Sequence, residues 1–107
     1  MVDLELDELK REFLDEAGEK VAEMQTALET VPNSASLDRL AYLAHQLKGS
    51  GGSYGYQRIS TDAEEVEKAV ESLAARQSGD VATEAKIQQH VLNLRAEIDK
   101  RSKELAG

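Results

Sequence analysis

The residues best suited to chemistry lie between Ala44 and Gly55, in the run AHQLKGSGGSYG. Neutral histidine is a nucleophile through one ring nitrogen when the other nitrogen holds the proton. His45 follows Ala44, which belongs to the apolar face of a predicted helix, so its imidazole is expected about 100° around that helix, at the edge of the core. Lys48 lies three residues farther on and faces the same side. The pattern indicates a nucleophilic histidine with a neighbouring positive charge.

Three glycines follow this pair, and their cost to helix stability needs an explanation. Glycine inside a helix costs roughly 1 kcal/mol relative to alanine, so Gly49, Gly51 and Gly52 together would cost about 3 kcal/mol if all were helical. One interpretation is steric: a helix surface without side chains beside His45 lets the backbone of another protein approach the imidazole. The other interpretation is a loop between two helices. The spacing alone leaves both interpretations open.

A carboxylate that accepts a hydrogen bond from the Nδ1–H of His45 would leave Nε2 free to attack. If the chain forms a helical hairpin that turns near Tyr56, residues equidistant from the turn lie level with each other. His45 is eleven residues before Tyr56, and Glu67 is eleven residues after it. Glu64 is the competitor, displaced by about 4.5 Å along the axis. The spacing favours Glu67 over Glu64; the alternative interpretation is that Glu67 is one solvated acid among its acidic neighbours.

Helices must position these residues, and apolar steps of three and four predict four of them. Pro32 ends the first segment, whereas Gly18 lies inside it, so either one helix or two consecutive ones are predicted there. The predicted buried positions are Leu6, Leu9, Phe13, Ala17, Val21, Met24, Leu28 and Val31; Leu37, Leu40, Ala41, Ala44 and Leu47; Ile59, Ala63, Val66, Val70 and Leu73; and Ile87, Val91, Leu94, Ile98 and Leu105.

Polar residues mark the expected starts of the later helices. Ser36 is the predicted N-cap of the second helix, Thr61 with Glu64 forms a predicted capping box for the third unless that helix begins a turn earlier, and Asp80 is the predicted cap of the last. Amphipathic helices joined by short connections bury their apolar faces by packing together. We therefore expect an all-α, antiparallel, up-down-up-down four-helix bundle with an N-terminal helical extension, and residues 1–107 as a single domain.

Composition narrows the function classes. The net charge of −8 argues against nucleic acid and membrane surfaces as partners, although it could simply keep the domain soluble. The chain has no cysteine, no long apolar run and no signal-peptide pattern, so a cytoplasmic location is the expectation. It has two histidines and no Glu-x-x-His pair, which argues against a metal-binding bundle. The second histidine, His90, is predicted to lie at the boundary of the core.

The run from His45 to Gly55 resembles the phosphorylation signature of histidine-containing phosphotransfer (HPt) domains. That signature reads histidine, any residue, leucine or isoleucine, lysine and glycine, with a further glycine about ten residues after the histidine. The matching residues here are His45, Leu47, Lys48, Gly49 and Gly55. The upstream segment Phe13-Leu14-Asp15-Glu16-Ala17 resembles the start of the family's N-terminal helical region, and the likeness extends from about Leu9 to about Ile98.

The resemblance implies that His45 accepts a phosphoryl group from the aspartyl-phosphate of a receiver domain and passes it on. By position, Lys48 is implied to be the cation that faces the phosphate. Glu67 falls where chemotaxis-type kinases place a carboxylate that contacts the histidine. Mg²⁺ is expected on the receiver, so we expect no cofactor on this chain. Together with the steric argument, docking is expected over three glycines: Gly49, Gly52 and Gly55.

Several alternatives stay open within this interpretation. The chain could be a freestanding carrier, a phosphoacceptor module of a larger chemotaxis-type or hybrid histidine kinase, or a helical adaptor that docks receivers without transfer. Its 107 residues cannot hold an ATP-binding domain beside the bundle, and no GxxxxGK[ST] loop is present. We therefore expect a phosphohistidine carrier, monomeric by default, whose partners are a receiver domain, a histidine kinase or both. Three tyrosines flank the site, and packing is favoured over docking for them: Tyr42, Tyr54 and Tyr56.

Overall fold

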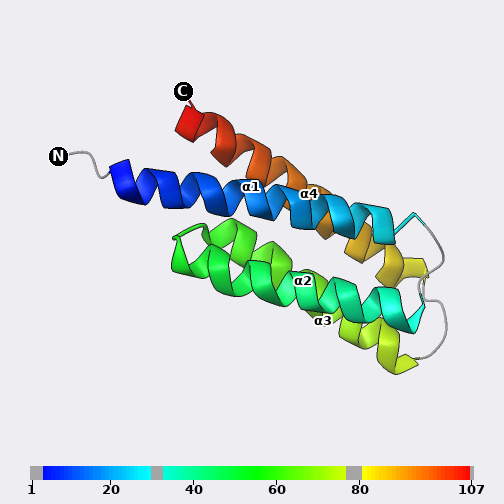
Figure 1. The fold of residues 1–107 in the computed structure, drawn as a ribbon. Coiled ribbons are helices and arrows are strands. Elements are labelled where there is room, and N and C mark those ends of the chain that lie inside the picture. The colour runs from blue at the N-terminus through cyan, green and yellow to red at the C-terminus, as the bar shows by residue number, and fades with distance from the viewer. Residues whose placement is uncertain (1–3, 30–32, 77–80, 107) are drawn as a thin grey trace.

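The computed structural model describes residues 4–29, 33–76 and 81–106, and these form four α-helices without any strand. The helices are α1 (Leu4–Ala27), α2 (Ser34–Ser53), α3 (Gln57–Arg76) and α4 (Val81–Ala106). They alternate in direction along an elongated bundle of 54 × 20 × 20 Å (Figure 1). The predicted antiparallel four-helix bundle is therefore confirmed. No described helix is both long and apolar enough to cross a membrane.

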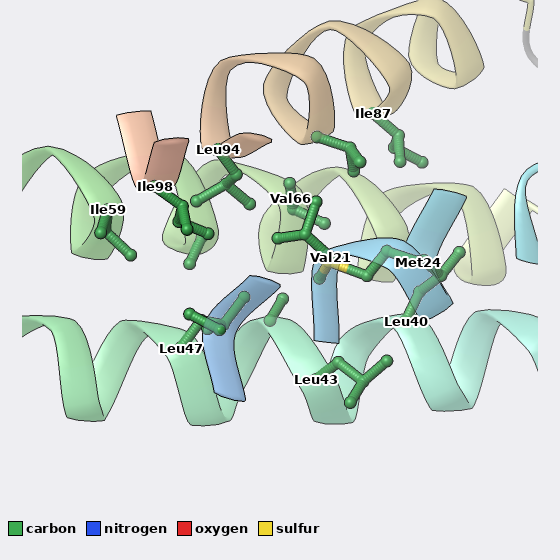
Figure 2. Packing of buried hydrophobic residues seen from close by; sticks show 14 of the residues in the cluster. Val21, Met24, Leu40, Leu43, Leu47, Ile59, Val66, Ile87, Leu94 and Ile98 are labelled. Carbon is green, nitrogen blue, oxygen red and sulfur yellow. The ribbon is translucent and has the colours of Figure 1, made fainter. Parts of the chain in front are cut away.

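One hydrophobic core is shared by all four helices. Figure 2 shows side chains from each helix pointing into this common interior. Burying a leucine, isoleucine or valine side chain contributes about 1.5–3 kcal/mol, so this shared core is the main source of stability. The buried apolar residues are Phe13, Leu14, Ala17, Val21, Met24, Leu40, Leu43, Ala44, Leu47, Ile59, Ala63, Val66, Ala69, Val70, Leu73, Ile87, Val91, Leu94 and Ile98.

The first turns of α1 form the N-terminal helical extension. Leu6 and Leu9 are exposed, so their predicted burial was wrong. The ring of Phe13 stacks on Tyr54 in the α2–α3 turn, and the N-terminal end of α1 extends past that turn (Figure 1). The α2–α3 hairpin therefore ends before it can cover these two leucines. Helix α1 runs without interruption through Gly18, which decides between the two predicted arrangements in favour of a single helix.

Helices α2 and α3 both begin earlier than the predicted N-cap residues, Ser36 and Thr61. Asn33, not Ser36, is the N-cap of α2. The Asn33 side chain accepts a hydrogen bond from the Ser36 N–H at 2.9 Å, and the Ser36 hydroxyl accepts one from the Asn33 N–H at 2.9 Å. This reciprocal capping box lets α2 begin at Ser34, because the asparagine side chain reaches the third residue of the helix.

Helix α3 begins at Gln57, so the predicted start at Thr61 was wrong and the earlier start is correct. The reason is the tight turn that ends α2, which leads directly into α3. Three of the predicted positions, Val31, Pro32 and Asp80, lie outside the described residues.

Candidate functional site

Helix α2 continues through the glycine-rich segment and ends only at Ser53. The loop interpretation of Gly49, Gly51 and Gly52 was therefore wrong. A Cβ atom at Gly51 would lie 3.2 Å from both the Ile59 side chain and the Ser60 backbone nitrogen. Gly51 is thus needed for the close approach of α3, a packing role that the sequence analysis did not separate from docking.

The other two helical glycines face open space. A Cβ atom at Gly49 would meet nothing within 4 Å, and one at Gly52 would meet only the Ser60 hydroxyl, at 3.7 Å. No packing constraint inside the bundle therefore accounts for glycine at either position. Both leave the surface of α2 bare on the side of His45, as the steric interpretation expects.

Gly55 forms the turn between α2 and α3. Its φ of 80° is a left-handed conformation that favours glycine. The N–H of Tyr56 donates to the Gly51 carbonyl at 2.8 Å, and the N–H of Gly55 donates to the Gly52 carbonyl at 3.1 Å. This is the hydrogen-bond pattern of a Schellman motif, which satisfies the last carbonyls of the helix. Gly55 thus has a turn-forming role, while its part in docking stays a prediction.

His45 projects from α2 with its side chain 72% exposed. Its Nδ1 lies 2.9 Å from Oε2 of Glu67 on α3, and the Glu67 side chain is only 17% exposed. An ionised carboxylate can only accept a hydrogen bond, so Nδ1 carries the proton of the neutral ring. In that tautomer Nε2 carries the lone pair. The contact expected from counting along the hairpin is present.

Lys48 lies between two carboxylates of α3. Its Nζ is 3.8 Å from Oε1 of Glu67 and 3.7 Å from Oε1 of Glu64. Glu67 therefore contacts His45 through one carboxylate oxygen and Lys48 through the other, whereas Glu64 contacts Lys48 and Lys68. Both acids weighed in the sequence analysis belong to the site, with different partners.

A hydrogen bond from Ser60 fixes the two helices beside the site. The Ser60 hydroxyl donates to the Lys48 carbonyl at 2.9 Å. Together with the close contact at Gly51, this bond holds α2 and α3 close together on the turn side of the site, at Lys48. The sequence analysis missed Ser60. Its position three residues before Ala63 was the available signal, since such spacing places it near the buried face of α3.

A family model described as Hpt domain matches residues 8–102 of the 107-residue chain. The chain belongs to the Hpt domain family. Hpt domains take part in histidine phosphotransfer in two-component systems and interact with receiver domains and kinases. No match was found among the curated proteins or among the solved structures.

The three tyrosines of this Hpt domain divide into two groups. Tyr54 and Tyr56 stack on Phe13, with ring centroids 5.2 and 5.9 Å away, and burial raises the pKa of the Tyr56 phenol. Packing was therefore the correct interpretation for these two. Tyr42 is exposed on α2, one turn before His45, so the same prediction was wrong for it.

Polar neighbours hold the exposed ring of Tyr42. Gln46 donates a hydrogen bond to its hydroxyl at 2.8 Å, and the Arg39 guanidinium lies 5.4 Å from the ring centroid. Arg39 is in turn paired with Glu23 of α1, with an Nη2 to Oε1 distance of 3.0 Å. The hydrogen bond from Arg39 lowers the pKa of the Glu23 carboxyl. Tyr42 therefore presents an exposed aromatic ring one turn before His45, with contacts to Gln46 and Arg39.

The second histidine of the Hpt domain has a carboxylate partner as well. Nδ1 of His90 on α4 lies 3.0 Å from Oδ1 of Asp62 on α3. Their side chains are 21% and 14% exposed, in agreement with the predicted boundary position. Within the described residues, no group of three or more histidine, cysteine, aspartate or glutamate residues could hold a metal ion.

The His45 site is an exposed helix face. A surface hollow does exist between the start of α3 and α4, but His45 is not among its lining residues, which include Tyr56, Arg58 and Lys100. Small-molecule sites are usually concave and enclose most of their ligand. The exposed His45 face is better suited to contact with another protein than to capture of a small molecule.

Proposed function

We propose that His45 is the phosphoacceptor of this Hpt domain, taking a phosphoryl group from a receiver aspartyl-phosphate and passing it to a further acceptor. The observation that carries the proposal is the hydrogen bond between His45 Nδ1 and Glu67 on a side chain that is 72% exposed. It orients the ring and leaves Nε2 directed away from its carboxylate partner. The core shared by all four helices supports treating residues 1–107 as one domain.

The proposed step is an in-line displacement at phosphorus. The Nε2 lone pair forms the N–P bond while the P–O bond to the aspartyl carboxylate breaks, and that electron pair leaves on the carboxylate oxygen. The Nδ1 proton stays on the ring, where the Glu67 carboxylate offsets the positive charge that develops. Return of the phosphoryl group to another aspartate follows the same path in reverse.

Lys48 supplies the positive charge in this proposal. Its Nζ is 3.8 Å from the carboxylate that holds the histidine, so a rotation of its flexible side chain would bring it to the phosphoryl oxygens. An ammonium placed there forms charge-assisted hydrogen bonds with them. We assign the Mg²⁺ of the reaction to the receiver domain and no cofactor to this chain.

The docking surface in this proposal is the exposed face of α2. The bare backbone at Gly49 and Gly52 lets the receiver reach His45, and Tyr42 offers an exposed aromatic contact one turn earlier. Aromatic residues are common anchors of protein interfaces, because they bury a large area at a small cost in conformational entropy.

Transfer of radiolabelled phosphate tests the proposal. Phosphorylated receiver domains are mixed with the wild-type chain and with the His45→Gln variant. We expect label only on the wild type, and the label should be acid-labile and stable in alkali, as a phosphohistidine is. Label retained by His45→Gln would refute the assignment of His45.

A second candidate is a phosphoacceptor module of a chemotaxis-type kinase. The contact between His45 and Glu67 favours it, because the resemblance places a carboxylate there in that group. A histidine kinase supplied with ATP is then the donor to test. Label from the kinase but from no receiver would support this module, whereas receiver binding without any label would indicate an adaptor.

A further inference from the structure

Lys48 is already paired in the absence of phosphate. Its Nζ lies 3.7 Å from Glu64 and 3.8 Å from Glu67, so two carboxylates compete with any phosphoryl group for this ammonium. The two acids are not equivalent. The Glu67 side chain accepts the hydrogen bond from His45 and is 17% exposed, whereas the Glu64 side chain is 40% exposed and also lies 3.8 Å from the Nζ of Lys68.

We propose that Glu64 is a positioning residue that holds Lys48 against α3 while His45 is unphosphorylated and gives it up when the phosphoryl group arrives. This inference rests on the proposed function. A phosphoryl group carries more negative charge than one carboxylate and attracts the ammonium more strongly at equal distance. Glu64 retains Lys68 when Lys48 leaves, so its charge stays compensated and the exchange has a small electrostatic cost.

The first consequence concerns the phosphorylation equilibrium. Glu64→Gln removes one of the two carboxylates that compete for Lys48, so the lysine becomes more available to the phosphoryl group. We expect the equilibrium between phosphorylated receiver and phosphorylated His45 to shift toward His45 by about two- to fivefold, the range of an exposed ion pair.

A double-mutant cycle separates this mechanism from a general effect of charge. If Glu64 acts by holding Lys48, the shift caused by Glu64→Gln should be largely lost in a Lys48→Ala background. If the acid merely repels phosphate, the shift should have the same size in both backgrounds. Glu71→Gln is the matched control, because it removes an exposed acid seven residues farther along the same face of α3.

The experiment measures the equilibrium distribution of label with one phosphorylated receiver, and then the extent of phosphorylation by phosphoramidate, a small donor that needs no docking surface. Circular dichroism checks that each variant stays helical. A two- to fivefold shift in Glu64→Gln that largely disappears with Lys48→Ala, with no shift in Glu71→Gln, is the expected result.

Three outcomes would overturn the inference. They are an unchanged equilibrium in Glu64→Gln, an equal shift in the Lys48→Ala background, and an equal shift in Glu71→Gln. If the wild-type chain accepted phosphate from no donor, the proposed function would fall as well. Normal wild-type transfer combined with an unaffected Glu64→Gln variant would reject the role of Glu64 alone.

Discussion

The two histidines of this chain each contact a carboxylate through Nδ1 at almost the same distance, yet their side chains differ in exposure. His45 on α2 lies 2.9 Å from Glu67, and His90 on α4 lies 3.0 Å from Asp62, in each case through Nδ1. Both carboxylates belong to α3. The His45 side chain is 72% exposed and that of His90 only 21%.

The residues three positions later differ as well. Lys48 follows His45 with its ammonium beside the same carboxylate, whereas Asn93 follows His90 and accepts a hydrogen bond from Gln89. A histidine–carboxylate pair is therefore not sufficient to indicate a nucleophile. In our proposal, the exposure of the histidine side chain and a nearby cation distinguish the His45 site from the His90 contact that joins two helices.

The largest expected difference between the pairs is in phosphate acceptance. His45→Gln should reduce labelling by a phosphorylated receiver to background, because it removes the nucleophilic nitrogen. His90→Gln should keep wild-type labelling, because His90 lies in the α3–α4 contact. Autoradiography of the two variants side by side is the measurement, and loss of label in His90→Gln would contradict a purely structural role for His90.

A bulky residue on the His45 face should block the partner. Gly52→Leu is expected to slow transfer from a receiver by at least about tenfold, equivalent to about 1.4 kcal/mol, because the side chain projects from a bare part of α2. Transfer rates from a receiver and from phosphoramidate are compared. The small donor should be unaffected, and equal slowing with both donors would show that Gly52 does not act through docking.

Removal of the neighbouring cation should have an intermediate effect. Lys48→Ala is expected to slow transfer by about tenfold, or about 1.4 kcal/mol in the barrier, because charge on the phosphoryl oxygens is no longer neutralised. Single-turnover kinetics with excess receiver measure this. Asn93→Ala, at the same position relative to His90, is the control, and a comparable loss there would contradict a specific role for the lysine.

Removal of the carboxylates, Glu67 and Asp62, should have the smallest effects on phosphoryl transfer, and the two effects should differ. Glu67→Ala is expected to slow transfer only modestly, because the imidazole keeps its nucleophilic nitrogen but loses the group that orients it. Asp62→Ala should leave transfer unchanged and lower the free energy of unfolding by about 1 kcal/mol, since its bond to His90 is partly buried. Kinetics and urea unfolding of both variants are the measurements. Unchanged transfer in Glu67→Ala would reject the orienting role.

Local pattern predicted most of the fold. The apolar spacing identified nearly all core positions of the four helices, because the periodicity of a helix is a property of the chain itself. It failed at Leu6 and Leu9, whose own helix is intact but whose neighbours end too early to cover them. The capping residues misplaced the N-cap of α2 at Ser36, and for α3 the earlier of the two predicted starts is correct.

The sequence predicted some residues of the candidate site but not all of their contacts. His45 and Lys48 are evident from their types and spacing on one helix. Glu67 could be located by counting from the turn, because the rise per residue is the same in both helices of a hairpin. The assignment of Glu64 to Lys48 needed the relative rotation of α2 and α3, and the pairing of His90 with Asp62 needed that of α3 and α4. Neither rotation follows from spacing within one helix.

The sequence by itself determined which faces of the helices are apolar, and it placed the proposed nucleophile, His45, and the proposed cation, Lys48, on one side of one helix. Only the tertiary structure decided that Gly51 serves packing while Gly49 and Gly52 leave the surface bare, and that one histidine is exposed while the other joins helices. The physical reason is that the spacing of apolar residues specifies only which face of a single helix is buried. The space between helices depends on how closely and at what rotation they pack, and here the core, the Schellman turn at Gly55 and the Ser60 bond set that geometry.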